Sequence, residues 1–504
     1  MSVRIYRKLR GGDWGLINLI KGGGSLKKGN AKVAIVILTA IILIALIPWL
    51  LIIARYLDID IYELFTPSEE IEELADTEDG QRVDEPPVTE PVTEPEQENH
   101  QPPDPDSEQG SFADSPPEDT IINIKDLHPE LFRELNDTVS RYKAVAVSMT
   151  VYDGEAGEFF TYEYGNADVS GGRLVNTDTK LRIASLAKLT TVICAMILFD
   201  EGLLDLDTDI SVYLGYEVKN SGYPDTAITT RMLMQHTSSI FDSGAFQSSR
   251  ENDSSQSIRS LLDQSTSSER SSSFRRSEPG TNFEYSNFGY AVLGAVCENV
   301  AGKTLNTLAH DALFAPLGID AAYLPATLHE TGNIAVLYND RHDVTRSVES
   351  QLLTSESEIL GHDLHLAQGN LTISTVDYAK ILAMLGNGGV YHDVKILSGE
   401  SVRAINLANV KGAAYDQGLA TRYTFGDFVS GEGFYWHTGS AYGLFSQYLY
   451  SGEGNRGVVV ATTGAATSRE PNGMVTVCSE LSAVVWRELN QLKNLVEGEE
   501  IGEN

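Results

Sequence analysis

The order of the predicted secondary structure indicates a mixed α/β (α+β) fold in which one antiparallel sheet is built from both ends of the folded domain. Two predicted strands, 144–151 and 158–164, lie near the start of that domain and are joined by an Asp-Gly turn. Two more, 444–450 and 457–463, lie near its end. The long section from about 205 to 400 mixes short helices and loops. We therefore expect a sheet flanked by helices, with a mainly helical subdomain inserted.

The first 55 residues combine a basic arm with an uncharged apolar run. Residues 1–55 carry nine Lys or Arg against one acidic residue, and the arm 1–32 holds most of the basic side chains. The 22 residues 33–54 carry no charge and are enough for a helix that crosses a bilayer. The positive-inside bias then predicts a cytoplasmic arm, a single transmembrane helix and an extracellular remainder. A cleaved signal peptide is the alternative, but the apolar run is longer than the usual h-region of a signal peptide and lacks a convincing A-x-A cleavage site.

Residues 55–120 have the composition of a disordered stalk. From 56 to 120 the chain carries 22 acidic residues against one arginine, and ten of its 17 prolines fall there. Low hydrophobicity and like-charge repulsion keep such a segment from burying a core, and proline with charge keeps it extended. Its expected function is spacing, with a specific acidic docking segment as the alternative. At the other end, 493–504 is expected to form an acidic tail.

Residues 121–492 are expected to form the folded domain. An amphipathic helix at 127–142 is predicted near its start and another helix at 475–489 near its end. The serine-rich run 248–277 has little periodicity and is predicted to be a flexible insertion.

Charge and cysteine content exclude several classes of function. Residues 121–490 carry a net charge of about −18, so we expect no nucleic-acid partner. Cys194, Cys297 and Cys478 are too few for a disulfide framework, and each lies in an apolar run typical of a core. No Cys or His cluster has the spacing of a metal site, and we expect no metal or cofactor.

The stretch 181–203 predicts the helix around which the domain is organised, with small and apolar residues at the spacing of a buried face. Ser185 and Lys188 lie three apart at its start, so one turn places them on the same face. A serine hydroxyl needs a nearby proton acceptor to attack an acyl group, and a desolvated lysine can serve. A helix N-terminus also favours negative charge near the serine oxygen. Alone, the spacing fits equally a capping serine and a surface lysine.

Two further motifs follow in order, Tyr285-Ser286-Asn287 and His437-Thr438-Gly439-Ser440. With them the chain resembles the serine β-lactamase and penicillin-binding protein superfamily, specifically its class C-like branch. Segments similar to family landmarks cover about residues 125–490. They are IASLAKLTT, EGLLDLDTDISVYL, ITTRMLMQHTSS, PGTNFEYSNFGYAVLG, FAPLGI, GNLTISTVDYAKI and YWHTGSAYGLFS. The resemblance implies a β-lactamase/transpeptidase-like fold.

The resemblance also implies roles for the first two motifs. Ser185 is the expected nucleophile, which becomes acylated, and Lys188 is its proton partner. Tyr285 is expected to carry the proton to the leaving nitrogen. A phenol, with a pKa of about 10, needs a nearby positive charge to act as a base, and Lys188 supplies one. Which of the two takes the proton stays open, since coupled sites share their titration. Asn287 is expected to orient the lysine and the substrate amide.

The third motif is implied to be an edge strand that faces the nucleophile. Gly439 is expected to leave room for the substrate, and Thr438 and Ser440 to offer hydroxyls to a substrate carboxylate. The backbone N–H groups of Ser185 and Ser440 are implied to form the oxyanion hole.

The histidine of the third motif departs from many family β-lactamases, which carry lysine there. H-T-G resembles some secreted DD-peptidases, and H-x-G variants occur among D-amino-acid amidases and esterases. The resemblance places His437 among the expected catalytic residues, but because histidine is only partly charged at neutral pH, it predicts weaker carboxylate recognition or the use of another cation. His236 matches a landmark expected to be structural. Ser239 replaces the usual glycine of that landmark, which puts the local turn in question.

The combined expectation is a membrane-anchored extracellular serine hydrolase that acts on D-amino-acid-containing peptides of the cell wall, most similar to a DD-carboxypeptidase. The alternative activities within the family are those of a β-lactamase, a carboxylesterase and a D-aminopeptidase, which share the three motifs and differ in the shape of the pocket. The alternative outside the enzymes is a penicillin-binding receptor that acylates without turnover, or an inert wall-binding module. The oligomeric state does not follow from the sequence.

Overall fold

The computed structural model describes residues 119–154, 157–249, 256–262, 273–412, 414–425, 433–451 and 456–497. All of them fall in the second of the two compact units of the chain, Gln109–Asn504. The predicted arm 1–32, the predicted span 33–54, nearly all of the predicted stalk and residues 498–504 lie outside the described residues. Within the part described, no helix is both long and apolar enough to cross a membrane.

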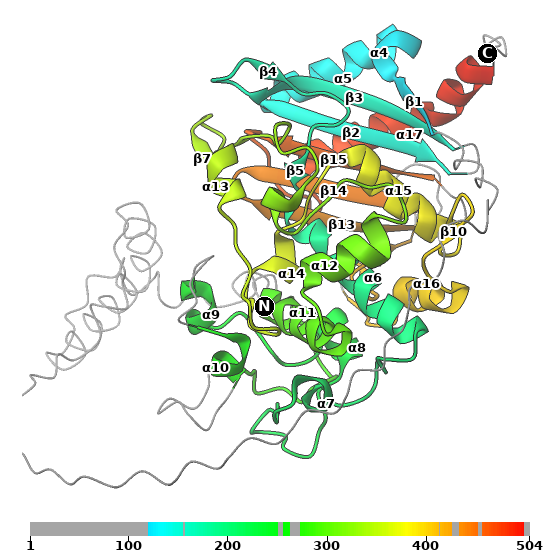
Figure 1. Ribbon diagram of the computed structural model, residues 1–504. Helices are drawn as coiled ribbons and strands as arrows, with labels where there is room; N and C mark the ends of the chain where they lie inside the picture. Colours follow the sequence, from blue (N-terminus) through cyan, green and yellow to red (C-terminus); the bar gives the residue numbers. More distant parts are fainter. Residues whose placement is uncertain are drawn as a thin grey trace, which may run out of the picture. The chain divides into compact units, whose positions relative to one another are not determined.

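One large sheet forms the centre of the described domain (Figure 1). In that part of the chain it has nine strands in the order β1-β3-β2-β15-β14-β13-β12-β11, with β4 paired to β3. Their bounds are β1 Thr120–Asn123, β2 Ala146–Asp153, β3 Glu158–Asp168, β4 Arg173–Leu174, β11 Asp416–Gln417, β12 Arg422–Thr424, β13 Phe434–Ala441, β14 Leu444–Ser451 and β15 Arg456–Thr463.

The two ends of the domain meet in the middle of this sheet, as predicted. Strand β2 pairs antiparallel with β15, and the register sets Ala146 against Thr463. The neighbouring pairs β2·β3, β14·β15 and β13·β14 are also antiparallel, whereas β1 and β3 are parallel. The stalk was predicted to extend to residue 120, but β1 already begins at Thr120, because its backbone pairs there with Glu158.

Helices cover both faces of the sheet (Figure 1). On one face α5 Pro129–Tyr142 and α17 Thr476–Glu497 pack together over an apolar layer of strand side chains. On the other face α15 Thr375–Gly386 lies over β15 and β2. Every residue of β2 is buried, although apolar and hydroxyl side chains alternate from 147 to 151, because helices cover both faces of the sheet here.

The closing helix is longer than predicted. It runs through 493–497, residues that were expected to belong to the acidic tail. The physical reason is apolar contact, because Leu492 is fully buried and Val496 packs against the same core layer.

The inserted subdomain is built around α6 Ala187–Asp200 and α11 Asn287–Ala301, which pack against each other. Every residue of α6 from 187 to 198 is buried, as expected of a helix enclosed on all sides. The remaining described helices are α4 Ile124–Leu127, η1 Ala184–Leu186, α7 Ile210–Leu214, α8 Thr230–Met234, α9 Gly244–Ser248, α10 Ile258–Leu262, α12 Leu305–Ala309, η2 His310–Phe314, η3 Pro325–Thr327, α13 Val348–Leu352, α14 Leu366–Gly369 and α16 Gly399–Asn406.

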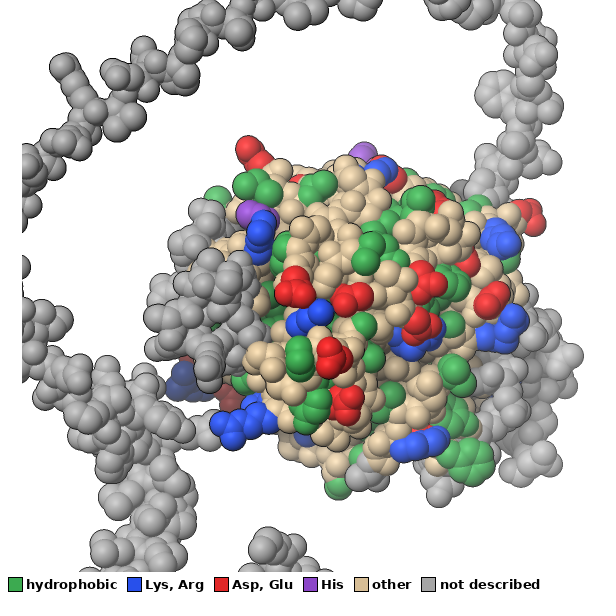
Figure 2. Space-filling model, turned by 90° about the horizontal axis from the view of Figure 1, so that it is seen from below, with side chains coloured by type: hydrophobic (Ala, Val, Ile, Leu, Met, Phe, Trp, Pro, Cys, Tyr) green, Lys and Arg blue, Asp and Glu red, His purple; other side chains and the backbone are tan. Residues whose placement is uncertain are grey.

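Three two-stranded pairs complete the described structure. They are β5 Leu181–Arg182 with β8 Thr372–Ile373, β6 Leu337–Tyr338 with β7 Val344–Arg346, and β9 Val390–Tyr391 with β10 Val394–Lys395. On the face drawn in Figure 2, acidic and basic side chains are interspersed among polar and apolar ones.

Three residues in the described part of the serine-rich run are buried, which corrects the prediction of a flexible insertion for these three residues. Ile258 and Leu262 of α10 are buried in the subdomain core. Ser273 is buried as well, and its hydroxyl donates to the Leu261 carbonyl at 2.8 Å. Two apolar residues at the i, i+4 spacing are enough to anchor a single turn of helix, and so short a period is easily missed in sequence.

The three cysteines are buried and unpaired, as predicted. Cys194 and Cys297 lie in α6 and α11, and Cys478 lies in α17.

The buried carboxyl group of Glu298 predicts a pH-dependent stability. Its two oxygens accept hydrogen bonds from the backbone N–H groups of Leu305 (3.0 Å) and Gly361 (2.7 Å). Burial nevertheless raises the pKa of Glu298 from its ordinary 4.5 to about 7. Between these values the folded state retains a proton that the unfolded chain releases, so the free energy of unfolding falls as the pH rises, by up to about 3 kcal/mol. Urea denaturation from pH 4.5 to 7.5 should show a shallower pH slope for Glu298→Gln. Equal slopes for the variant and the wild type would contradict this assignment.

Candidate active site

The backbone turns sharply just before Ser185. The short strand β5 ends at Arg182, and Ala184 adopts a left-handed conformation with φ of 51°. An alanine in that region costs about 1–3 kcal/mol and persists only where the surroundings impose it. Ser185 follows in the 3₁₀ turn η1 that leads into α6, and it is the one residue of 181–198 that is not buried. The turn therefore presents the serine hydroxyl to the surface of an otherwise enclosed helix.

Lys188 is fully buried one turn later, and its ammonium group faces three acceptors. Its Nζ donates to the Ser185 hydroxyl at 3.3 Å, to the Asn287 side-chain oxygen at 2.9 Å and to the Gln368 carbonyl at 2.6 Å. Three acceptors match the three N–H groups of an ammonium. The structure thus brings together the first predicted motif and the asparagine of the second.

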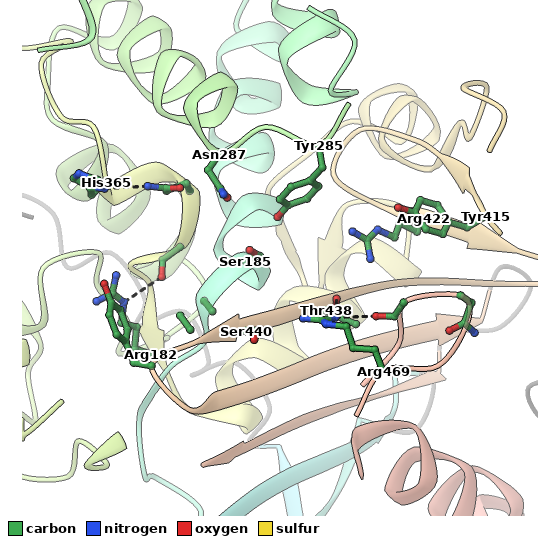
Figure 3. A pocket seen from close by; sticks show the side chains of 17 residues that line it. Arg182, Ser185, Tyr285, Asn287, His365, Tyr415, Arg422, Thr438, Ser440 and Arg469 are labelled. Atoms are coloured by element: carbon green, nitrogen blue, oxygen red, sulfur yellow. Dashed lines mark hydrogen bonds between the residues drawn. The ribbon is translucent and has the colours of Figure 1, made fainter. Parts of the chain in front are cut away.

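The second motif lies at the start of α11. Ser286 caps this helix by accepting from the Gly289 N–H at 2.8 Å, and Asn287 is its first residue. Tyr285 precedes the cap, and Figure 3 shows its phenol directed into the cavity toward Ser185. The Lys188 Nζ lies 5.1 Å from the centre of the Tyr285 ring.

The third motif lies on β13, at an edge that faces the nucleophile. Strand β13 pairs with β14 along its whole length but with β12 only at 434–436. Among the described residues, no strand covers the other edge of 437–441, and this edge contacts η1. Thr438 and Ser440 line the cavity there, as predicted. This is the edge strand that the resemblance implied.

Gly439 has a different role from the predicted one. It does not line the cavity. A Cβ at this position would lie 2.5 Å from the Ile183 carbonyl oxygen and 2.2 Å from the Ser446 hydroxyl. The glycine therefore lets the strand approach the turn that carries Ser185, rather than leaving room for a substrate.

His437 lies behind the cavity wall. Its side chain is buried, and its Nδ1–H donates to the Thr438 carbonyl at 2.8 Å, which leaves Nε2 as an acceptor. That Nε2 atom has no hydrogen-bond partner among the described residues. Burial, with the positive charges of Arg422 and Lys188, holds the pKa of His437 well below the usual value of histidine. A neutral, enclosed imidazole does not supply a charge to a substrate, so the cation must come from elsewhere.

The cavity that holds Ser185 has a volume of about 520 Å³ and a cationic lining. Its side chains include three arginines and no Asp or Glu. The lining residues are Arg182, Ala184, Ser185, Tyr285, Asn287, His365, Gln368, Gly369, Tyr415, Arg422, Thr438, Ser440, Ala441, Tyr442, Arg469, Asn472 and Gly473. No group of three or more His, Cys, Asp or Glu side chains in the described residues is placed to hold a metal ion.

Two of these arginines lie beside Thr438, on the side of the cavity away from Arg182 (Figure 3). Arg422 is largely buried, with its guanidinium 4.6 Å from the centre of the Tyr415 ring, and its Nε has no hydrogen-bond partner among the described residues. Arg469 donates to the Gly473 carbonyl at 2.8 Å and to the Thr438 hydroxyl at 3.4 Å. Burial and the charge of Arg422 lower the pKa of Arg469. Two guanidinium groups held together in this way favour an anion between them.

Sequence reasoning missed Arg422, Arg469 and Gln368. The arginines belong to no motif, and no spacing marked them. Gln368 directly precedes the landmark GNLTISTVDYAKI, but it acts through its backbone carbonyl, which side-chain patterns do not reveal.

His236 has the structural position expected of it. Its Nδ1 accepts from the Ser286 N–H at 3.1 Å, and its ring lies 4.4 Å from the Tyr285 ring. Burial and the charge of Lys188 hold the pKa of His236 well below its usual value, so the ring stays neutral. Ser239, which replaces the glycine usual in this landmark, still adopts a left-handed backbone conformation with φ of 65°.

Comparisons with known proteins agree with this geometry. The Beta-lactamase family model matches residues 130–476, well over half of the chain. The chain is 25% identical over 173 residues to Penicillin-binding protein 4* of Bacillus subtilis (strain 168), which covers 34% of this chain and 36% of that protein. It is 28% identical over 204 residues to the D-alanyl-D-alanine-carboxypeptidase/endopeptidase AmpH of Escherichia coli (strain K12), which covers 38% of this chain and 50% of that protein.

The chain thus spans half or less of the length of these curated relatives. Among solved structures, a class C beta lactamase from Rhodobacter sphaeroides superimposes with a TM-score of 0.54 at 15% identity, covering 72% of this chain and 99% of that one. At this identity the likeness concerns the fold, which is the predicted β-lactamase/transpeptidase-like fold. The match to the family model shows that the chain belongs to the beta-lactamase family of serine hydrolases.

Proposed function

We propose that the protein is a membrane-anchored, extracellular D-amino-acid peptidase of the DD-carboxypeptidase type that cleaves cell-wall peptides through an acyl-enzyme. The observation that carries this proposal is the Lys188 Nζ, 3.3 Å from the Ser185 hydroxyl at the edge of a cationic cavity. The names of the two curated relatives, a penicillin-binding protein and a D-alanyl-D-alanine carboxypeptidase/endopeptidase, support a D-peptide substrate.

Acylation begins when the Ser185 oxygen attacks the carbonyl carbon of the scissile bond. The serine proton passes to the Lys188–Tyr285 pair, which acts as one coupled acceptor. As the tetrahedral intermediate collapses, the C–N bond breaks and the same proton moves to the leaving nitrogen. The Tyr285 phenol, directed toward Ser185 from the cavity wall, is the proposed carrier (Figure 3).

Charge that develops on the carbonyl oxygen needs fixed donors. We assign this role to the backbone N–H groups of Ser185 and Ser440, on the turn and the edge strand that Gly439 brings close. Asn287 holds Lys188 and offers its amide to the acyl part of the substrate. Water then attacks the Ser185 ester, and the same pair takes the water proton and returns a proton to the serine.

The cationic end of the cavity suits a substrate carboxylate. Arg422 and Arg469 supply two fixed charges beside the Thr438 hydroxyl, which replaces the charge that a buried neutral His437 lacks. A peptide that ends in a free D-amino acid carries such a carboxylate next to its leaving nitrogen. A simple ester does not, so this feature favours peptides or β-lactams over esters.

The location is proposed from residues 33–54 and their basic and acidic flanks. A helix there, followed by an extended acidic spacer, holds a hydrolase close to a polymeric wall substrate. Release of the full-length protein from membranes by alkaline carbonate would contradict the anchor.

Turnover of three substrates tests the proposed activity. We expect the full-length protein to release D-alanine from a peptide ending in D-Ala-D-Ala faster than it hydrolyses a chromogenic cephalosporin or a short-chain ester. Ser185→Ala should lower each rate by at least about a thousandfold, because the nucleophile acts as a unit with its base. Ser140→Ala, which alters an exposed serine of α5, is the matched control and should keep full activity.

Each other outcome of that experiment has a definite meaning. Turnover of none of the three substrates contradicts the proposal. A stable penicillin adduct without hydrolysis indicates a non-turnover receptor. Full activity in Ser185→Ala means that another residue is the nucleophile.

The two arginines predict discrimination between a free and a blocked C-terminus. Arg422→Gln and Arg469→Gln should each lower kcat/KM about 10–100-fold for the peptide with a free carboxylate, and little for the same peptide as its C-terminal amide. Lysine at either position should restore part of the loss, because it keeps the charge but not the planar fork. Arg231→Gln, at a surface ion pair with Asp207, is the control. Equal losses on both peptides would show that the arginines support the fold instead.

A further inference from the structure

The loop 236–242 holds the second motif in place, although it contributes no side chain to the cavity lining. It contains two left-handed residues, His236 and Ser239. Asn220 fixes it by donating to the Ser239 hydroxyl at 3.0 Å. At its end Asp242 points its carboxylate at the first residues of α11.

The two oxygens of Asp242 have separate partners. Oδ1 accepts from the Phe288 N–H at 2.8 Å and from the Ser286 hydroxyl at 3.3 Å, which closes the start of the helix. Oδ2 accepts from the Asn287 side-chain amide at 2.8 Å. One oxygen therefore caps α11, and the other contacts the residue that holds Lys188.

We propose that Asp242 is a positioning residue that fixes the amide of Asn287 with its oxygen toward Lys188. An amide side chain can turn over and exchange its oxygen and nitrogen at little steric cost. Here each end has only one compatible partner, because a carboxylate accepts and an ammonium donates. The flipped amide would set oxygen against the carboxylate and N–H against the Lys188 Nζ. Asp242 thus acts on the acyl-transfer chemistry through Asn287 without touching the substrate.

The orientation matters because Lys188 has few other partners of opposite polarity. The groups that face it are the Ser185 hydroxyl and the Gln368 carbonyl, the rings of Tyr285 and Tyr290 at 5.1 and 5.3 Å, and the neutral histidines 236 and 437. The described neighbours that these contacts and charges identify include no carboxylate. Losing the Asn287 oxygen therefore removes one of the three acceptors of a buried ammonium.

The test is Asp242→Asn, which keeps an oxygen for the Phe288 N–H but places an NH₂ group opposite Asn287. The amide must then turn, and its NH₂ faces Lys188. This inference rests on the proposed acyl-transfer function, so kcat/KM is measured on whichever of the three substrates the wild type turns over. We expect a loss of about tenfold or more, because the buried Lys188 ammonium has lost an acceptor.

The matched control is Asp200→Asn. Asp200 also accepts from three donors at a helix start, the Ser398 N–H and the hydroxyls of Ser398 and Ser401, but it does not line the cavity. Asp200→Asn and Asp242→Asn should lose comparable thermal stability, while only the second loses activity.

In the double variant Asp242→Asn with Asn287→Asp, each hydrogen-bond donor at positions 188, 242 and 288 again faces an acceptor. The new carboxylate at position 287 accepts both from the amide now at position 242 and from Lys188. The kcat/KM of the double variant should therefore exceed that of Asp242→Asn. A capping role alone predicts near-wild-type activity for Asp242→Asn and no recovery in the double variant. Either result would overturn the proposal.

A measurement that needs no turnover tests the positioning role of Asp242 independently of the proposed function. In protein labelled with [ε-¹³C]lysine, the Lys188 signal is the one missing from Lys188→Arg. If Asn287 presents its oxygen to Lys188, the chemical shift of that signal at one fixed pH should differ between Asp242→Asn and wild type. An unchanged chemical shift would refute the positioning role, even for a protein inactive on all three substrates.

Discussion

A buried ammonium group sets the arrangement of the whole site. Lys188 has no exposed surface, and its Nζ satisfies its three N–H groups on Ser185 of η1, on Asn287 of α11 and on the Gln368 backbone carbonyl of α14. Removing a partner from a buried charge costs on the order of 3–5 kcal/mol. The Lys188 Nζ therefore links three helical segments through its hydrogen bonds, and the Ser185 hydroxyl is one of the three acceptors. The hydrogen bonds that satisfy the lysine therefore also hold the Ser185 hydroxyl, the candidate nucleophile, beside Lys188.

The distribution of charge around that point explains the unusual third motif. The cavity lining carries the charges of Arg182, Arg422 and Arg469, and the buried imidazole of His437 lies close enough to Arg422 and Lys188 to feel their charges. A further cation in this space would add repulsion, whereas a neutral histidine adds none. The two arginines beside Thr438 come from β12, the neighbour of β13, and from the segment after β15.

The sequence was sufficient for the sheet built from both ends, the central helix and the placement of the three motifs around one cavity, because periodicity and motif order carry that information. It misassigned Gly439, whose missing side chain accommodates the Ile183 backbone, since such a contact exists only after folding. Arg422, Arg469 and the Gln368 carbonyl were out of reach for the same reason. The closing helix was predicted too short, because the apolar contact of Val496 outweighs the acidic composition of its surroundings.

The central claim is that the Ser185 oxygen forms a covalent acyl bond. Intact-protein mass spectrometry of the full-length protein, quenched within seconds of mixing with a D-Ala-D-Ala peptide or a penicillin, tests it directly. We predict an adduct with the mass of the acyl group, carried after proteolysis by the peptide that contains Ser185 and absent from Ser185→Ala. An adduct on another residue, or peptide cleavage without any covalent adduct at Ser185 even when deacylation is slowed by low temperature, would contradict the account.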